Sequence, residues 1–477
     1  MDGLNLSLIN TRLRVVDDDS TPIGPYYLIA ALAERGRQVE YRDLATASDY
    51  NPFAVDAVLA AFEQAQAPVL GVSLFSVNLP VVLIAAQQYR HRGGCKPIIL
   101  GGPGPNGVER RILEKFPAID IAVRGEGERV LPDILDALDA GRVPQGPGIF
   151  ARHADGTITG ADPVRIADLD ALPCPDRTRM IAAHPHAVAP VVTARGCPFS
   201  CSFCDIITMW GRKVGYRSVP NVIDEIKAIA ETGMTEIRIL DDTLTANRVR
   251  LREFCSALRA TGLNIRWKCF ARADQVDEDL LADMADSGCC SIYFGVDAGN
   301  ENGWKAINKR LSRDMVVRNI LAAVKYSNAT ASFIWGYPFE TFSDFADMVD
   351  LSLELAEGAH AHPYRLGQQH HLLVPEPATP LYSQYGHTVR FAAGMPGSVF
   401  CGRPLASFAG QAGYDECIEL IRTDSMLFSP FYYYPSENFM EKLLVFNDAP
   451  FAETTLGGRG RPVVEKLRRI RQLLAAK

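Results

Sequence analysis

Apolar and polar residues recur with two different periods along the first third of the chain. Short apolar runs of strand type fall at residues 4–9, 39–43, 69–74, 98–100 and 119–123. Stretches with helical spacing lie between them, at residues 22–36, 55–66, 80–89 and 130–138. This regular alternation predicts an α/β domain with a parallel, doubly wound, Rossmann-like sheet over residues 1–145.

The same alternation returns after a stretch rich in proline and glycine. Residues 146–190 are predicted to be a linker that contains a small hairpin around Asp155 and Gly156. Beyond a strand that ends near Val192, strands are predicted at residues 236–240, 265–269, 291–294, 332–335 and 366–373. Helices are predicted between them at residues 221–232, 248–261, 277–287, 313–326 and 342–355. Six strands with helical crossovers predict a partial (β/α)6 barrel of TIM type over residues 191–395.

The remaining residues, 396–477, lack the barrel pattern and are predicted to form a small helical extension. A helix is expected at residues 414–423, and the aromatic stretch F-Y-Y-Y-P at 431–435 either covers a cavity or fills a core. Residues 465–477 form a basic amphipathic pattern, with Leu467, Ile470, Leu473 and Leu474 along one side. Docking of this helix onto the barrel is favoured over contact with a membrane.

Composition and charge narrow the class of protein. A chain of 477 residues predicts two or three domains, and 47% hydrophobic with 22% charged residues is typical of a soluble globular protein. A net charge of −7 argues against nucleic acid as a partner. The sequence has neither an 18-residue apolar run nor a signal-peptide pattern, so a cytoplasmic protein without a membrane partner is expected. Eleven cysteines, mostly outside any pattern, favour a reducing compartment.

The chemistry of the chain is concentrated in residues 193–205, T-A-R-G-C-P-F-S-C-S-F-C-D. Cys197, Cys201 and Cys204 have the spacing C-x3-C-x2-C. Three thiolates on one loop suit a cubane iron–sulfur cluster, which usually takes four cysteines, so one iron is left open for a substrate or cofactor. Three reduced structural cysteines are the alternative, and zinc is another, although zinc prefers four ligands in pairs. Ligand type and spacing favour the cluster.

At these residues the sequence resembles the radical SAM superfamily. The resemblance implies a [4Fe-4S] cluster whose open iron binds the amino and carboxylate groups of S-adenosylmethionine (SAM), with Phe203 near the adenine. An external one-electron reductant such as flavodoxin or ferredoxin would reduce the cluster. Cleavage of SAM would then give methionine and a 5′-deoxyadenosyl radical, which takes a hydrogen atom from a small-molecule substrate.

Several polar residues fall where the predicted barrel strands end, which is where barrels of this kind carry their chemistry. By resemblance to the family, SAM-binding roles are implied for Asp241, Asp242, Arg272, Asp297, Gly336 and Glu340. The family often has glutamate in place of Asp297. His370 and His371, at the end of the sixth strand, are candidates for binding substrate or cobalamin. Plainer roles stay open: a helix cap for the aspartates, pairing of Arg272 with Asp274, and ordinary core packing for the histidines.

The stretch G-R-K-V-G-Y-R-S-V-P at 211–220 closely follows the cysteine loop and places Tyr216 within reach of the predicted site. The Tyr216 phenol is the candidate catalytic group, as a proton donor or hydrogen-atom relay. Alternatively, Tyr216 packs the loop and Arg217 neutralises a carboxylate.

The first domain resembles the cobalamin-binding domain that precedes many radical SAM domains, on the motifs L-G-G-P and V-R-G-E-G-E. Ser73, Gly101, Gly102, Gly125 and Glu126, near the strand ends, are the candidate cobalamin- or substrate-binding residues. The D-x-H-x-x-G motif that supplies histidine to cobalt is absent, and glycines after strands also serve turns alone. The sequence therefore leaves cobalamin binding open.

Two enzyme reactions fit this domain plan. The first, preferred for the chain length, the short tail and Tyr216, is radical dehydration at C3′ of an aminoglycoside such as paromamine. It resembles the radical SAM diol dehydratases of antibiotic biosynthesis, which are lyases, and an NADPH-dependent reductase would then act on the product. The alternative is cobalamin-dependent C-methylation of a secondary metabolite. A non-catalytic cofactor-binding or electron-transfer subunit is disfavoured by the intact G-V-D-A-G and G-Y-P-F-E loops.

Overall fold

The computed structural model describes residues 3–11, 22–44, 51–184, 188–394, 404–447 and 461–475. The chain divides into two compact units. Unit 1 contains residues 1–185, 374–378 and 391–432, and unit 2 contains residues 186–373, 379–390 and 433–477. Among the described residues, no helix is both long enough and apolar enough to cross a membrane.

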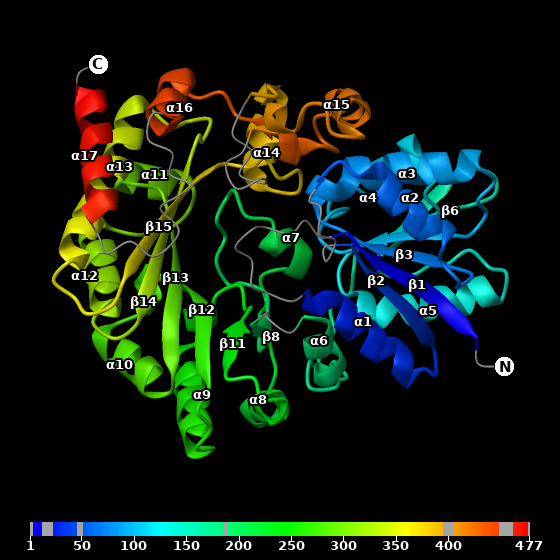
Figure 1. Cartoon of the computed structure of the whole chain (residues 1–477), viewed down its shortest axis with the longest axis horizontal. Helices are drawn as coiled ribbons and strands as arrows, with labels where there is room; N and C mark the ends of the chain where they lie inside the picture. The colour runs from blue at the N-terminus through cyan, green and yellow to red at the C-terminus, as the bar shows by residue number, and fades with distance from the viewer. Residues whose placement is uncertain are drawn as a thin grey trace. The chain divides into compact units, whose positions relative to one another are not determined.

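Unit 1 is built on a seven-stranded sheet in the order β2-β1-β3-β4-β5-β6-β7 (Figure 1). Its first five strands are parallel and match the predicted runs: β1 (Leu4–Asn10), β2 (Gln38–Asp43), β3 (Leu70–Ser73), β4 (Ile98–Gly101) and β5 (Ile121–Val123). The helices are α1 (Ile23–Glu34), α2 (Val55–Glu63), α3 (Leu79–His91), α4 (Glu109–Lys115) and α5 (Gly127–Asp139). One apolar core contains residues of α2, α3 and α4, and another contains residues of α1 and α5. Helices therefore cover both faces, which confirms the doubly wound fold.

The hairpin that the sequence places in the linker belongs to this sheet. Its strands, β6 (Ile149–Arg152) and β7 (Ile158–Gly160), extend the sheet antiparallel beyond β5. Phe150 and Ala151 of β6 are buried, so the hairpin has an apolar surface that the sheet covers. The rest of the predicted linker includes a further short helix, α6 (Arg177–Ala183), and residues 185–187 lie outside the described part of the chain.

Unit 2 contains the predicted partial barrel. Its six strands are all parallel, in the order β15-β14-β13-β12-β11-β8. They are β8 (Ala189–Val191), β11 (Glu236–Ile239), β12 (Arg266–Arg272), β13 (Cys289–Asp297), β14 (Asn328–Trp335) and β15 (Leu366–Leu372). The predicted crossover helices are present as α8 (Val219–Glu231), α9 (Arg248–Ala260), α10 (Glu278–Asp286), α12 (Arg313–Ala323) and α13 (Phe342–Ala359). Two short helices, α7 (Ile206–Trp210) and α11 (Glu301–Ala306), were not predicted.

The two faces of the barrel sheet differ in polarity because side chains alternate along a strand. On β12, Trp267 and Cys269 are buried, and Trp267 contacts Phe254 of α9 edge to face with ring centroids 5.7 Å apart. The alternate residues, Lys268 and Phe270, are only half-buried. The apolar face is thus covered by the helices, while the opposite face carries the polar side chains available to a ligand.

The C-terminal residues are divided between the units and do not form one separate extension. The helix α15 (Tyr414–Arg422) confirms the predicted helix, and its residues Cys417, Ile418 and Ile421 are buried in a core of unit 1. In unit 2, α16 (Phe439–Asn447) and α17 (Arg461–Ala475) follow, and α17 packs against α13 as docking onto the barrel requires (Figure 1). Residues 396–403, 448–460 and 476–477 of the predicted extension lie outside the described residues.

Shortening one apolar side chain of α17 should lower stability measurably. Ile470 is fully buried, whereas its neighbour Arg469 is exposed. We expect Ile470→Val to cost about 0.5–1.5 kcal/mol, because it removes one buried methylene group. Chemical denaturation should show this loss, while Arg469→Lys should change the free energy of unfolding by less than about 0.5 kcal/mol.

Candidate functional site

The cysteine loop leaves the short edge strand β8 and is fixed at its start by a buried carboxylate. The backbone N–H groups of Thr193 and Ala194 donate to Asp241 Oδ1 at 2.6 and 2.9 Å, and the Thr193 hydroxyl donates to Asp241 Oδ2. Burial raises the pKa of Asp241, and these hydrogen bonds oppose that shift. Asp241 therefore holds the start of the cysteine loop, and its predicted contact with SAM stays a prediction.

Further backbone contacts fix the middle of the loop. The Gly196 N–H donates to Asp242 Oδ2 at 3.0 Å, and Gly196 has φ 100°, a conformation that favours glycine. The Ser202 N–H donates to the Ile307 carbonyl at 3.0 Å, while the Ser202 carbonyl accepts from the Leu381 N–H at 2.9 Å. The loop is thus held from several elements of unit 2 without using its thiols.

The three cysteine side chains are half-buried and lie within reach of polar donors and cations. Thr243 Oγ1 lies 3.5 Å from Cys197 Sγ, and Arg272 Nη1 lies 3.7 Å from Cys201 Sγ. Burial raises the pKa of Cys201 and raises that of Cys204 to about 12, and the neighbouring thiols add to both shifts. These donors and cations suit three thiolates that share negative charge on a cluster.

No three His, Cys, Asp or Glu side chains surround a single ion position within the part of the chain that the structure describes. A cubane cluster does not require such a set, because each thiolate binds a different iron. The cysteines therefore fit the predicted cluster in residue type, spacing and surroundings.

Asp297, at the end of β13, is held by a lysine that the sequence reading missed. Lys309 is buried, and its Nζ donates to Asp297 Oδ2 and to the Gly295 carbonyl. Asp297 has φ 67°, an uncommon conformation for a residue with a side chain. Its carbonyl also accepts from the Tyr337 hydroxyl at 3.2 Å. No pattern in the stretch around Lys309 indicates this pairing.

The G-Y-P-F-E loop after β14 lies beside the cysteine loop. Phe203 contacts Tyr337 edge to face, with ring centroids 6.0 Å apart. The Gly336 N–H donates to Glu340 Oε2 at 3.1 Å, and Lys442 Nζ of α16 donates to Glu340 Oε1 at 2.9 Å. Glu340 is buried in these contacts, so its carboxylate links the loop to α16, and its predicted contact with SAM stays a prediction.

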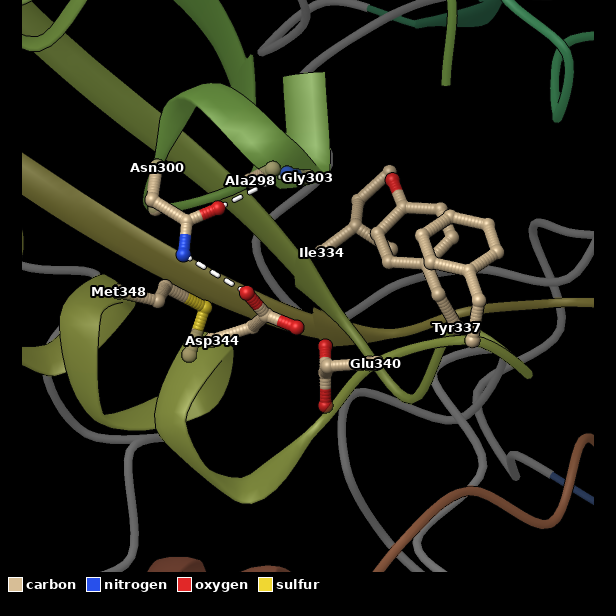
Figure 2. Close-up of a pocket in the computed structure, with 10 residues that line it drawn as sticks. Ala298, Asn300, Gly303, Ile334, Tyr337, Glu340, Asp344 and Met348 are labelled. Carbon is tan, nitrogen blue, oxygen red and sulfur yellow. Dashed lines mark hydrogen bonds between the residues drawn. The ribbon is translucent and has the colours of Figure 1, made fainter. Parts of the chain in front are cut away.

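A small pocket lies under this loop, with room for little more than one water molecule. Figure 2 shows the Glu340 and Asp344 carboxylates from one side of it and Asn300 from another. Asn300 Nδ2 donates to Asp344 Oδ1 at 2.8 Å, and Asn300 Oδ1 accepts from the Gly303 N–H. The pocket therefore joins the loops after β13 and β14, which carry Asp297 and Gly336.

Tyr216 and Arg217 lie on and just after β10 (Gly215–Tyr216), which pairs with β9 (Ala194–Arg195) next to the cysteine loop. The Tyr216 side chain is 38% exposed, and the Arg250 guanidinium lies 5.2 Å from its ring centroid. Burial is the largest cause that raises the pKa of Tyr216, so the phenol is a proton donor. Arg217 forms a buried ion pair with Glu225 of α8, so it neutralises a carboxylate, as the alternative in the sequence analysis stated.

The two candidate histidines of β15 face opposite sides of the sheet. His370 lies 2.7 Å from Ser352 Oγ of α13 and stacks on Phe333, and burial lowers its pKa to about 3. His370 therefore belongs to the helix-covered face, as the core-packing alternative stated. His371 Nε2 lies 3.1 Å from Gln369 Oε1 and 3.5 Å from the Tyr293 hydroxyl. Only His371 lies on the polar face, with two partners that sequence reasoning missed.

The candidate residues of unit 1 lie at the carboxyl edge of its parallel strands. A Cβ added to Gly101 would meet no atom within 4 Å, so the space above this residue is open. At Gly102 and Gly125 the φ angles are 87° and 85°, and an added Cβ would approach Leu74 O to 2.9 Å and Pro163 Cβ to 2.8 Å. Glu126 is buried and accepts a hydrogen bond from the Ile166 N–H, which gives it a structural role, and its predicted ligand contact stays a prediction. Gly102, Gly125 and Glu126 thus have structural roles at this edge. Ser73 and Gly101 are the candidates for which these contacts give no such role.

Comparison with known families decides the identity of both units. A family model described as the radical SAM superfamily matches residues 191–352, and one described as the B12 binding domain matches residues 9–135. The chain carries a radical SAM domain that follows a B12-binding domain. The resemblance seen in the cysteine motif and in the L-G-G-P and V-R-G-E-G-E motifs is thereby confirmed.

Named relatives of this radical SAM protein include a methyltransferase and a cyclase. An uncharacterized methyltransferase of Pyrococcus horikoshii is 26% identical over 362 residues, which are 74% of this chain and 78% of that protein. The anaerobic magnesium-protoporphyrin IX monomethyl ester cyclase of Cereibacter sphaeroides is 32% identical over 226 residues, but the match spans only 37% of its length. The radical SAM methyltransferase TsrM of Kitasatospora setae, solved with cobalamin and a [4Fe-4S] cluster, has a TM-score of 0.66 and 18% identity, with both chains fully covered. At that identity the likeness shows the fold.

The radical SAM domain implies two cofactors, a [4Fe-4S] cluster and SAM. The cysteine loop supplies the ligand types that the cluster needs, and Phe203, Tyr337 and Asp297 surround the same end of the barrel. The radical SAM barrel thus places its candidate residues at one sheet edge, as the fold predicts. The positions of the SAM contacts stay a prediction.

Proposed function

We propose that this protein is a cobalamin-dependent radical SAM methyltransferase that acts on a small molecule. The observation that carries the proposal is the presence, in one chain, of the anchored three-cysteine loop and a B12-type sheet whose carboxyl edge is open at Gly101. When bound, the cluster and SAM supply a 5′-deoxyadenosyl radical, and cobalamin supplies a carrier for a methyl group. The methyltransferase names of the first relative and of the solved structure favour methylation over dehydration.

In this proposal each part of the chain has a stated role. Cys197, Cys201 and Cys204 hold the cluster, while Phe203 and Tyr337 surround the adenine of SAM. Asp242, Arg272, Asp297 and Gly336 are proposed to surround the rest of SAM. Ser73 and Gly101 line the cobalamin edge, where ligands of open α/β sheets bind. His371 faces the substrate from the polar side of β15. An external one-electron donor is required, as in the rest of the superfamily.

One feature supports dehydration as a second candidate. Tyr216 is a partly exposed phenol next to the cysteine loop, and its raised pKa keeps it protonated at neutral pH. A protonated phenol can donate to a leaving hydroxyl group. In methylation the same side chain has no required role, so its substitution separates the two reactions.

The test uses the full chain, reconstituted anaerobically with iron and sulfide and then supplied with SAM and titanium(III) citrate. With hydroxocobalamin present, we expect S-adenosylhomocysteine to form, and we expect cobalamin to elute with the protein in gel filtration. Failure of cobalamin to bind, with 5′-deoxyadenosine formed equally in its absence, would overturn the proposal. In a parallel reaction with paromamine added, a product lighter than paromamine by one water would instead establish the dehydratase.

A larger side chain at the open sheet edge of unit 1 should weaken cobalamin binding without unfolding the protein. In Gly101→Leu the added Cβ meets no atom within 4 Å, at the edge proposed for cobalamin. We expect cobalamin uptake to fall at least tenfold, a change of about 1.4 kcal/mol in binding free energy, while cluster content is unchanged. Gly3→Leu is the matched control, because Gly3 is also unobstructed but precedes β1 at the opposite edge of the sheet. Equal uptake by both variants would contradict the placement of cobalamin at Gly101.

A further inference from the structure

Arg272, predicted among the SAM contacts, is fixed against the cysteine loop from two sides. Its Nε and Nη2 atoms donate to the two oxygens of Asp274, each at 2.9 Å. The Phe199 ring lies 3.9 Å from the guanidinium carbon, so the planar group stacks on a residue of the cysteine loop. The two contacts leave the Arg272 side chain little freedom to turn, because the paired hydrogen bonds fix its plane.

The remaining nitrogen of this guanidinium points at a cluster ligand. Arg272 Nη1 lies 3.7 Å from Cys201 Sγ, which is within hydrogen-bonding range for sulfur. The Arg272 residue is only 7% exposed, so water screens its charge weakly. Asp274 and the Asp297–Lys309 pair are the other charged groups around it, and the pKa of Arg272 stays above its ordinary value despite burial because of the Asp274 hydrogen bonds.

A cation held at this place has a defined electrostatic effect. Reduction adds one negative charge to a cluster, and a donor or positive charge near a ligand sulfur favours the more negative form. Hydrogen bonds to the sulfurs and net charge are the protein's main means of setting cluster potentials. Asp274 and Phe199 hold the Arg272 guanidinium against Cys201. The contact therefore belongs to the fold and does not depend on a bound substrate.

We propose that Arg272 raises the reduction potential of the cluster through its contact with Cys201, and that Asp274 and Phe199 hold it in position for this purpose. The redox role needs only the cluster, so it applies whichever reaction the protein catalyses. It differs from a SAM contact because it operates before SAM binds. Electron transfer from the external donor becomes more favourable by the same amount.

The measurement is a potentiometric titration of the reconstituted full chain, followed by electron paramagnetic resonance in the absence of SAM. For Arg272→Gln we expect reduction to be about tenfold less favourable, which is a shift of about 59 mV to more negative potential for one electron. Arg272→Lys keeps the charge but loses the paired hydrogen bonds and should give a smaller shift in the same direction. Phe199→Leu keeps the guanidinium but removes the ring that it stacks on, so the reduction potential should also become more negative.

Lys268 provides the matched control. It lies on the same strand and the same face as Arg272, four residues earlier, and its charge is already paired with Glu236 at 2.5 Å. At about 3.3 Å per residue it is roughly 13 Å away along β12. Lys268→Gln should therefore leave the reduction potential of the cluster unchanged.

Two results would overturn the proposal. One is an unchanged reduction potential in both Arg272→Gln and Arg272→Lys, and the other is a shift in Lys268→Gln as large as that in Arg272→Gln. If Arg272→Gln assembles no cluster, the Arg272→Lys and Phe199→Leu potentials decide the matter.

Discussion

Cys201→Ala is expected to abolish the formation of 5′-deoxyadenosine from SAM while the chain keeps its fold. Two thiolates cannot replace three in holding a cluster, and without the cluster SAM receives no electron. The loop itself should persist, because Asp241, Ile307 and Leu381 anchor it through backbone groups and no thiol is involved. Iron content, visible absorption and product formation after anaerobic reconstitution give the measurement.

Another cysteine of the chain supplies the control for this experiment. Cys95 is exposed and lies in unit 1, away from the cysteine motif in sequence and in unit assignment. Cys95→Ala should retain iron, absorption and 5′-deoxyadenosine formation at the level of the unmodified protein. A Cys201→Ala protein that still carries a full cluster and cleaves SAM would show that the ligand assignment is wrong.

Lys442→Met is expected to destabilise unit 2 by about 3–5 kcal/mol, the usual cost of leaving a buried charge without its partner. Lys442 is 0% exposed, and its Nζ donates to Glu340 Oε1 at 2.9 Å, to the Glu340 carbonyl at 3.1 Å and to Ser436 Oγ at 3.2 Å. Removing the ammonium leaves the Glu340 carboxylate buried, with the Gly336 N–H as its one remaining donor among the described residues. Chemical denaturation of both proteins at one pH measures the difference.

The pH dependence of this loss has a definite sign. Burial already raises the pKa of Glu340 above its ordinary value of 4.5, and Lys442 opposes that shift. In Lys442→Met the folded-state pKa rises further, so stability is retained below about pH 4.5 and falls as pH increases through the raised pKa. The double variant Glu340→Gln with Lys442→Met removes both charges and should recover most of the stability at pH 8. A loss in Lys442→Met that is below 1 kcal/mol at pH 8, or that does not change with pH, would contradict this account.

The elements that the sequence predicts well are those whose signal is local. Buried parallel strands such as β3 and β4 are nearly continuous apolar runs, and the three cysteines lie within eight residues. The helix α4 was missed because its sequence, E-R-R-I-L-E-K, is short and mostly charged. Its buried Glu109 is stabilised by an ion pair with Arg124, a partner that no local pattern reveals.

The roles of the site residues depend on partners that are distant in the sequence. Asp241 and Asp242 are adjacent carboxylates after one strand, yet they bond to different parts of a loop more than forty residues earlier. Lys309 and Lys442 lack any motif, although each completes a buried ion pair next to a predicted loop. Because spacing alone does not encode such pairings, the sequence located the loops but did not reveal the contacts within the protein that Asp241 and Glu340 make.

The return of residues 391–432 to unit 1 has a consequence for how this protein can be divided. Leu405, Phe408 and the buried face of α15 complete the core next to α2 and α3, although two long segments of the barrel unit, residues 186–373 and 379–390, lie between them in the chain. A gene truncated after residue 190 would therefore encode a B12-type sheet with an exposed apolar surface. A single crossover near residue 190 would therefore separate the sheet of unit 1 from the residues that complete its core.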